Sequence, residues 1–221
     1  RNKAALKNQE LNPNVAFSDS IQAGIYMKHP RIIRIKADMV DQMDYDKILS
    51  MYQDRFKDAS DFTFIFVGNV DVEKMKPVIA EYLGALPAVN RKETFKDNKI
   101  EMRQGIYKNE FTKQQETPKA SVFAFYNGDC KYDLRNNLLL SMTSQILDLV
   151  YTEKVREDEG GTYGVYVGGT LQKYPKEKAI LQIIFDTAPE KKEKLMKIIF
   201  GEIDNITKTG PSEANLNKVK E

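Results

Sequence analysis

The order of short apolar runs and amphipathic segments is the feature that most restricts the fold of this chain. Residues 62–67 form a run of aromatic and β-branched side chains that ends at Gly68, and such a run is typical of a buried strand. Four more strands are predicted at about 99–111, 119–127, 162–171 and 178–187. Helices are predicted from Asp71 to Gly84, at about 133–157 and 190–208, and from Ser212 onward. This order predicts an α+β fold, in which an antiparallel or mixed β-sheet has helices on one face.

The first 60 residues differ from the rest in that their sequence pattern is mostly helical. Helical spacing of apolar residues predicts helices over 17–28 and 44–56, and Pro30 interrupts the pattern between them. The stretch 88–98 is polar and reads as a loop. We therefore expect a helical lead-in over residues 1–60 and a separate domain over residues 61–221.

Length and composition restrict the class of protein. A chain of 221 residues suits one core with a helical appendage, or two small domains. Its 41% hydrophobic and 30% charged residues argue against disorder, and a net charge of +2 with interspersed signs argues against a nucleic-acid partner. No apolar run approaches the ~20 residues of a membrane span. The start at Arg1 and the charged helical pattern over 215–221 predict that both ends are cuts from a longer protein.

Reactive side chains are scarce. The single cysteine, Cys130, excludes an internal disulfide and a cysteine zinc cage. The single histidine, His29, excludes a zinc motif with two imidazoles one helical turn apart. A Cys–His nucleophile pair is formally open, but a packed histidine and an inert thiol are the favoured interpretation. We expect no catalytic residue and no metal ligand in this chain.

Two weaker patterns lie at the end of the long predicted helix. Gly160 and Gly161 follow a helix rather than open one, so a phosphate-binding loop is rejected. Four acidic residues could hold Ca²⁺, but they lack calcium-loop spacing and a solvated helix end is favoured. They are Glu153, Glu157, Asp158 and Glu159. Because the helix dipole disfavours anions at a C-terminus, the cluster hints at a requirement other than helix stability.

Arg156 and Tyr163 form the strongest candidate site. Arg156 lies in the last turns of the predicted helix, and Tyr163 lies on the strand that follows the Gly-Gly pair. A planar guanidinium and a phenol hydroxyl on the two sides of one tight turn can converge on a peptide backbone. The alternative is an arginine paired with a local carboxylate beside a tyrosine packed in the sheet. Spacing alone favours this alternative.

Three separated segments carry a resemblance to a known family. They are 62–71 with 82–87, Tyr26–Arg31 with Tyr52–Phe56, and Arg156–Tyr163 followed by Gly164 and Val165. Together they resemble the insulinase/pitrilysin family of zinc metallopeptidases, especially the large bacterial branch with four homologous domains in one chain. The resemblance implies a LuxS/MPP-like metallohydrolase fold and a C-terminal-type domain without zinc over 61–221, truncated at its last helix. Residues 1–60 would then end the preceding domain.

The resemblance also implies that zinc and the substrate clamp belong to different domains of the parent protein. In this family zinc lies in the first domain, on an inverted motif that nothing in this chain matches, so zinc belongs to the parent protein. The carried-over residues are Arg156 and Tyr163, which would clamp the peptide substrate over the zinc site, with Tyr163 also polarising the scissile carbonyl. The intact parent would hydrolyse peptide bonds in the periplasm or cell envelope of a Gram-negative bacterium.

Partners and rival functions complete these expectations. The partners of the chain would be a peptide substrate and the remaining domains of the same chain, or a partner subunit that carries the zinc site. One alternative is a non-catalytic homologue that acts as a partner subunit or scaffold of a processing peptidase. Another is an unrelated ligand-binding α+β domain.

Overall fold

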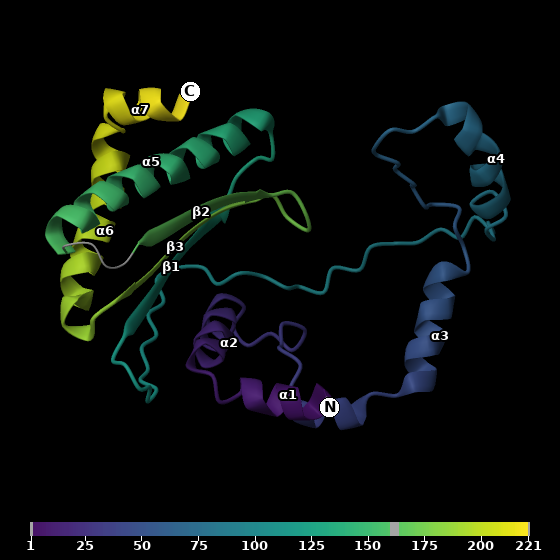
Figure 1. Ribbon diagram of the computed structural model, residues 1–221, viewed down its shortest axis with the longest axis horizontal. Coiled ribbons are helices and arrows are strands. Elements are labelled where there is room, and N and C mark those ends of the chain that lie inside the picture. The colour runs from purple at the N-terminus through teal and green to yellow at the C-terminus, as the bar shows by residue number, and fades with distance from the viewer. Residues whose placement is uncertain (1, 160–163, 221) are drawn as a thin grey trace. The chain divides into compact units, whose positions relative to one another are not determined.

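The chain divides into two compact units. The structure, a computed structural model (Figure 1), describes residues 2–159 and 164–220, without the side chains of 156–159. Unit 1 comprises residues 1–11 and 34–98, and unit 2 comprises residues 12–33 and 99–221. The predicted boundary between residues 60 and 61 lies inside unit 1. It stays a prediction about the domains of the parent protein.

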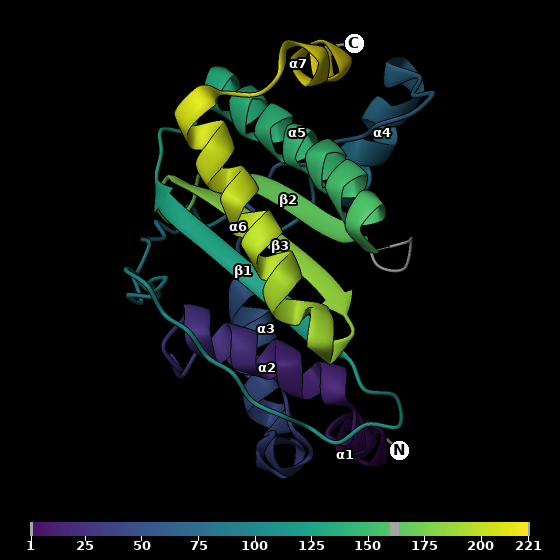
Figure 2. The same cartoon turned by 90° about the vertical axis from the view of Figure 1, so that its left-hand side faces the viewer.

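Unit 2 is built on a three-stranded antiparallel sheet. Its strands are β1 (Ala120–Asp129), β2 (Val165–Gln172) and β3 (Lys178–Thr187), in the order β1-β3-β2. The register places Phe185 of β3 opposite both Val122 of β1 and Val165 of β2. Helices α5 (Leu134–Glu159) and α6 (Lys192–Thr209) lie together on one face of the sheet (Figure 2). The predicted α+β fold, with helices on one face of an antiparallel sheet, is confirmed.

The core of unit 2 lies between this sheet face and the two helices. Alternate residues of a strand point to the same face, so the inward positions of β2 and β3 are apolar while their neighbours face outward. The buried cluster consists of Leu147, Tyr151, Val155, Val165, Val167, Ile183, Phe185, Leu195 and Ile199. Tyr151 is fully buried and its hydroxyl donates to the Ile199 carbonyl oxygen over 3.0 Å, which joins α5 to α6.

Local signals fix the ends of the C-terminal helices. A 3-10 turn, η2 (Pro189–Lys191), precedes α6. Gly210 follows α6 with a φ of 74°, a left-handed conformation that glycine adopts without a steric penalty. The last helix, α7 (Glu213–Lys220), packs on α5. Among the described residues, no helix is both long enough and apolar enough to cross a bilayer.

The predicted strand over 99–111 is wrong. This stretch has no regular structure and instead lies against α2 (Pro13–Ile25), which Asn12 caps. The Arg103 backbone N–H donates to the Ile25 carbonyl oxygen at 2.7 Å, and Arg103 Nε donates to the Gly24 carbonyl oxygen at 2.8 Å. These bonds satisfy carbonyl groups at the end of α2 that have no partner within the helix. The stretch therefore bonds to a helix end and not to a neighbouring strand.

Unit 1 consists of helices and irregular chain. Its elements are α1 (Asn2–Gln9), η1 (Ala37–Gln42), α3 (Tyr45–Phe56) and α4 (Val72–Tyr82). Asp44 and Asp71 cap α3 and α4, because each carboxylate accepts a hydrogen bond from a backbone N–H three residues later. Pro77 lies inside α4.

The predicted buried strand over 62–67 is also wrong. These residues form no strand, and Ile65 and Val67 are 81% and 92% exposed. A strand needs a neighbouring strand to pair its backbone groups, and the part of unit 1 that the structure describes supplies none. Only Ala37 and Asp58 are buried there. Unit 1 therefore leaves most of its apolar side chains uncovered, including Tyr45, Ile48, Tyr52 and Phe56 along α3.

Candidate functional site

The first residue of the predicted clamp pair lies at the end of α5, and the second lies between α5 and β2 in the sequence. Arg156 is in the last turn of α5, but the structure describes no atom of its side chain. Tyr163 lies outside the described residues, two positions before β2. The convergence of their side chains therefore stays a prediction.

Residues that flank the predicted pair in the sequence are anchored in the core of unit 2. Val155, directly before Arg156, is 5% exposed, and Val165, the first residue of β2, is 6% exposed. The two valines belong to the same buried cluster. The protein backbone on each side of the predicted pair is thus held by packing, as a site that must position a substrate requires.

The other residues singled out in the sequence are described only in part. Gly160 and Gly161 lie outside the described residues, and so do the side chains of Glu157, Asp158 and Glu159, so neither pattern is tested. His29 Nδ1 accepts the Arg31 backbone N–H at 3.2 Å. Cys130 is a half-buried free thiol. Among the side chains that the structure describes, which exclude those of 156–163, no group of three or more His, Cys, Asp or Glu residues is arranged to hold a metal ion.

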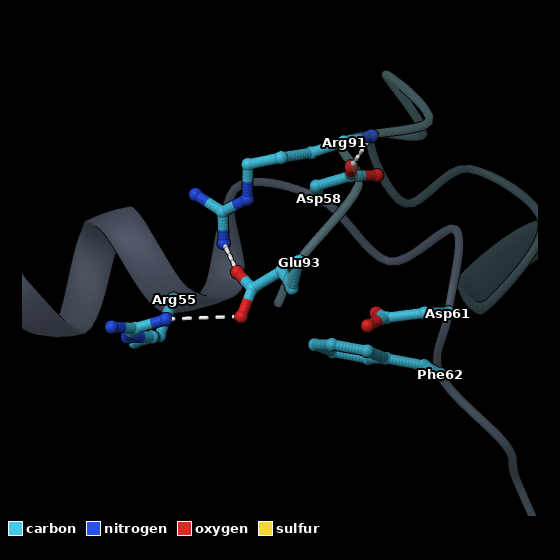
Figure 3. Close-up of a pocket in the computed structure, with 6 residues that line it drawn as sticks. All are labelled: Arg55, Asp58, Asp61, Phe62, Arg91 and Glu93. Carbon is cyan, nitrogen blue, oxygen red and sulfur yellow. Dashed lines mark hydrogen bonds and ion pairs between the residues drawn. The ribbon is translucent and has the colours of Figure 1, made fainter. Parts of the chain in front are cut away.

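A small charged cavity in unit 1 was not predicted from the sequence. It has a volume of about 80 Å³ and is lined by Arg55, Asp58, Asp61, Phe62, Arg91 and Glu93 (Figure 3). The guanidinium groups of Arg55 and Arg91 both reach the Glu93 carboxylate, the first over 3.0 Å. Arg91 also donates to Asp54 Oδ1 at 3.3 Å. Because carboxylates already pair both guanidinium groups, the cavity offers little to an anionic ligand.

Asp58 joins the two chain segments that line this cavity. Its carboxylate accepts three backbone N–H groups, those of Ser60 at 3.1 Å, Val89 at 3.0 Å and Arg91 at 2.6 Å. Hydrogen bonds, first that of the Ser60 side chain and then those of the backbone, hold the pKa of Asp58 well below its usual range. Asp58 joins residues 57–61 to 87–91 and is a structural residue. The Asp-x-Ser pattern, typical of a side chain that bonds its own backbone two residues on, could have indicated it.

A larger groove in unit 2 lies beside β2. We call it the α5–β2–α7 groove, and its volume is about 440 Å³. It is lined by Ser144, Gln145, Asp148 and Leu149 of α5, Tyr166 and Val167 of β2, and Lys218 and Val219 of α7. Tyr166 is 57% exposed, whereas Val167 is buried in the core. Sequence reasoning missed this groove because it depends on β2 being an edge strand.

The sequence is similar to known proteins of one family. Residues 42–221 match the family described as the peptidase M16 inactive domain. The chain is 20% identical over 230 residues to a zinc protease PQQL-like protein of Arabidopsis thaliana, covering 98% of this chain and 24% of that protein.

Three solved structures share the fold. The periplasmic protease PqqL from Escherichia coli matches with a TM-score of 0.79 at 21% identity, over 98% of this chain and 24% of that one. A mutant of the ferredoxin protease FusC, in complex with Arabidopsis ferredoxin, matches with a TM-score of 0.72 at 14% identity, over 99% and 24%. A peptidase M16 inactive domain from Pseudomonas fluorescens matches with a TM-score of 0.68 at 20% identity, over 98% and 52%. The chain thus spans about a quarter of the length of the proteases it matches.

Proposed function

We infer the function from the family, since the chain belongs to the peptidase M16 inactive-domain family and its predicted resemblance to insulinase/pitrilysin-type peptidases is confirmed. We propose that it is part of a longer zinc endopeptidase and binds the substrate over a zinc site located in another domain. The intact protein would hydrolyse peptide bonds, and this part would supply the clamp.

The family match over 42–221 is the observation that carries the proposal. The similar Arabidopsis protein is named a zinc protease, yet this chain has one histidine and one cysteine in 221 residues. Zinc sites of peptidases are built from several His and carboxylate ligands, so a zinc centre fits the rest of the parent better than this part. When bound there, zinc would activate a water molecule for attack on the peptide bond.

Arg156 and Tyr163 are the proposed clamp residues. The nearby residues Val155 and Val165 are buried in the core of unit 2, and this anchoring supports the role. A guanidinium donates a planar pair of hydrogen bonds to backbone carbonyls, and a phenol hydroxyl can stabilise charge that develops on the scissile carbonyl oxygen.

The substrate and the compartment follow from the relatives as proposals. One structural relative was solved in complex with a protein, ferredoxin, and another is a periplasmic protease. We propose a polypeptide substrate and a periplasmic or cell-envelope location for the parent. The remaining partners would be the other domains of the same chain or a subunit that carries the zinc site.

The proposal is tested by kinetics of the intact parent protein. Tyr163→Phe removes one hydroxyl and should lower kcat by about 10- to 1,000-fold, as the loss of one oxyanion donor does. Arg156→Lys should also lower kcat, because an ammonium cannot reproduce the planar fork. Both effects should fall on kcat more than on KM if the bonds form chiefly in the transition state.

Matched controls separate the clamp from general damage. Tyr174→Phe at an exposed hairpin turn and Arg135→Lys near the start of α5 make the same chemical changes away from the predicted pair. They should leave kcat unchanged. If the two clamp variants behave like these controls, Arg156 and Tyr163 have only a structural role. A parent whose remaining sequence lacks a zinc motif would support the alternative, a non-catalytic partner subunit or scaffold.

A further inference from the structure

We propose that Lys154 of α5 and Glu202 of α6 are positioning residues, whose ion pair fixes the rotation of α5 and with it the place of Arg156. This inference rests on the proposed function and deepens it. It assigns a part in substrate binding to two residues that would not touch the substrate.

The ion pair links the two helices close to the end of α5. Both helices lie on the same face of the sheet (Figure 2). Lys154 Nζ donates to Glu202 Oε1, and Lys154 is two positions before Arg156 along the chain. Among the α5 side chains that the structure describes, only that of Val155 comes later. Lys154 therefore makes the last described side-chain hydrogen bond of α5.

A second polar contact between the helices lies one turn earlier. The Tyr151 hydroxyl donates to the Ile199 carbonyl oxygen at 3.0 Å, and both residues are fully buried. Burial raises the pKa of the Tyr151 hydroxyl, and the neighbouring Tyr126 and Glu202 raise it further, so the hydroxyl keeps its proton and donates. The two contacts are three positions apart on each helix, which places them on one face of α5 and one face of α6. Two such contacts oppose rotation of α5 about its own axis, whereas one contact would act as a pivot.

The rotation of α5 decides where the backbone of position 156 lies. An α-helix turns by about 100° per residue, so this backbone lies about 200° around the axis from Lys154. A contact that holds Lys154 toward α6 therefore holds position 156 on the side of α5 away from α6. A misplacement of about 1 Å in a site that positions a substrate can cost about 100-fold in rate.

The last turn of α5 gains little stability from its own sequence. Residues 157–159 are all acidic, and the helix dipole disfavours anions at a C-terminus. Helix ends also fray. The packing of the buried Val155 and the contact of Lys154 with α6 are therefore what keep this end in place.

The pair differs from an ordinary surface ion pair in its burial. The Glu202 side chain is 13% exposed, and that of Lys154 is 46% exposed. Ion pairs between two exposed side chains contribute little, because both partners move freely. The Glu202 carboxylate has little of that freedom, so it gives Lys154 a fixed partner.

Kinetics of the full-length parent test the inference. The double variant Lys154→Met/Glu202→Gln removes both charges and so leaves no unpaired buried ion. It should lower kcat on a quenched-fluorescence peptide of casein sequence by about tenfold or more, while the melting temperature stays within about 3 °C. Lys154→Arg keeps the pair and should keep kcat within about twofold.

A second ion pair supplies the matched control. Lys178 Nζ lies 2.7 Å from Asp129 Oδ1 and joins the start of β3 to the end of β1. Lys178→Met/Asp129→Asn makes the same chemical change there and should leave kcat unchanged. Equal kcat values for the two double variants would overturn the inference, and if Arg156→Lys and Tyr163→Phe still lower kcat the clamp itself stands.

A cycle with Arg156 separates positioning from general damage. Because the pair acts through Arg156, its removal should lower kcat no further in an Arg156→Ala background. A merely structural loss would instead multiply with the Arg156→Ala loss, and that result would overturn the inference. An Arg156→Ala variant with unchanged kcat would refute the proposed clamp and the inference with it.

Amide hydrogen exchange gives a readout that does not depend on catalysis. In the parent that lacks the Lys154–Glu202 pair, the amides of 156–159 should exchange about fivefold faster or more, because the end of α5 opens more often. The control double variant should show the exchange of the unaltered parent at these positions. Unchanged exchange without the pair would show that it does not hold the helix end, and would overturn the inference.

Discussion

Gly169→Ala tests how closely β2 approaches α5. A methyl group at this position would lie 3.0 Å from Leu140 Cγ and 3.1 Å from the Leu140 backbone oxygen. That oxygen lies in the second turn of α5 and cannot give way unless the helix shifts. Overpacking of this kind destabilises a protein by about 1–3 kcal/mol. We expect that loss in the free energy of unfolding, measured by denaturant titration with circular dichroism.

The neighbouring glycine provides the control. A methyl group at Gly168 would meet Tyr166 Oη at 2.9 Å and Gln182 Nε2 at 3.1 Å, on the opposite face of the sheet. Both atoms end flexible side chains that can rotate away. The stiffer unfolded chain also adds about 0.4–1 kcal/mol of stability, so Gly168→Ala should be near neutral. If Gly169→Ala is as stable as Gly168→Ala, the close approach of helix and strand is not real.

Two further changes probe single contacts. Tyr151→Phe removes the hydroxyl that donates to the Ile199 carbonyl oxygen, and should lower the free energy of unfolding by about 1 kcal/mol in the same titration; an unchanged value would mean that the bond contributes nothing. Asp58 has a folded pKa below its unfolded value of about 3.9, so its contribution to stability is present above that pH and is lost as pH falls through the folded pKa. A carboxyl titration by NMR should show Asp58 ionised where ordinary aspartates are protonated, and an ordinary midpoint would contradict its hydrogen bonds. Asp58→Ala should speed amide exchange at Val89 and Arg91 by about tenfold or more, and unchanged exchange would show that other contacts hold the segment.

The elements that could be predicted are those whose signals are local. The hairpin of β2 and β3, the long helix α5 and the stop at Gly210 are encoded by periodicity and turn residues within a few positions. The strands predicted over 62–67 and 99–111 failed because a strand also requires a partner distant in sequence. The apolar pattern of residues 62–67 does not indicate which segment would pair with them.

The candidate sites divide in the same way. Arg156 and Tyr163 could be proposed because their sequence segment resembles that of a known family; spacing alone favoured the alternative. The groove could not, since it depends on β2 being at the edge and on α7 packing against α5. Asp58 was overlooked because two of its three partners, Val89 and Arg91, are about 30 positions away along the chain, although its bond to Ser60 is local.

The hydrogen bonds around Asp58 turn residues 60–88 into a closed loop. Ala59 donates to the Pro87 carbonyl oxygen at 2.7 Å, and Asp58 holds the backbone of Val89 and Arg91. The entropy lost in bringing the two ends together rises slowly with length, by about 0.6 kcal/mol for each doubling. Extra residues inserted at the exposed turn after Val67 should therefore leave the base of the loop intact. That turn is a suitable place to graft a fluorophore tag or an affinity handle on this protein.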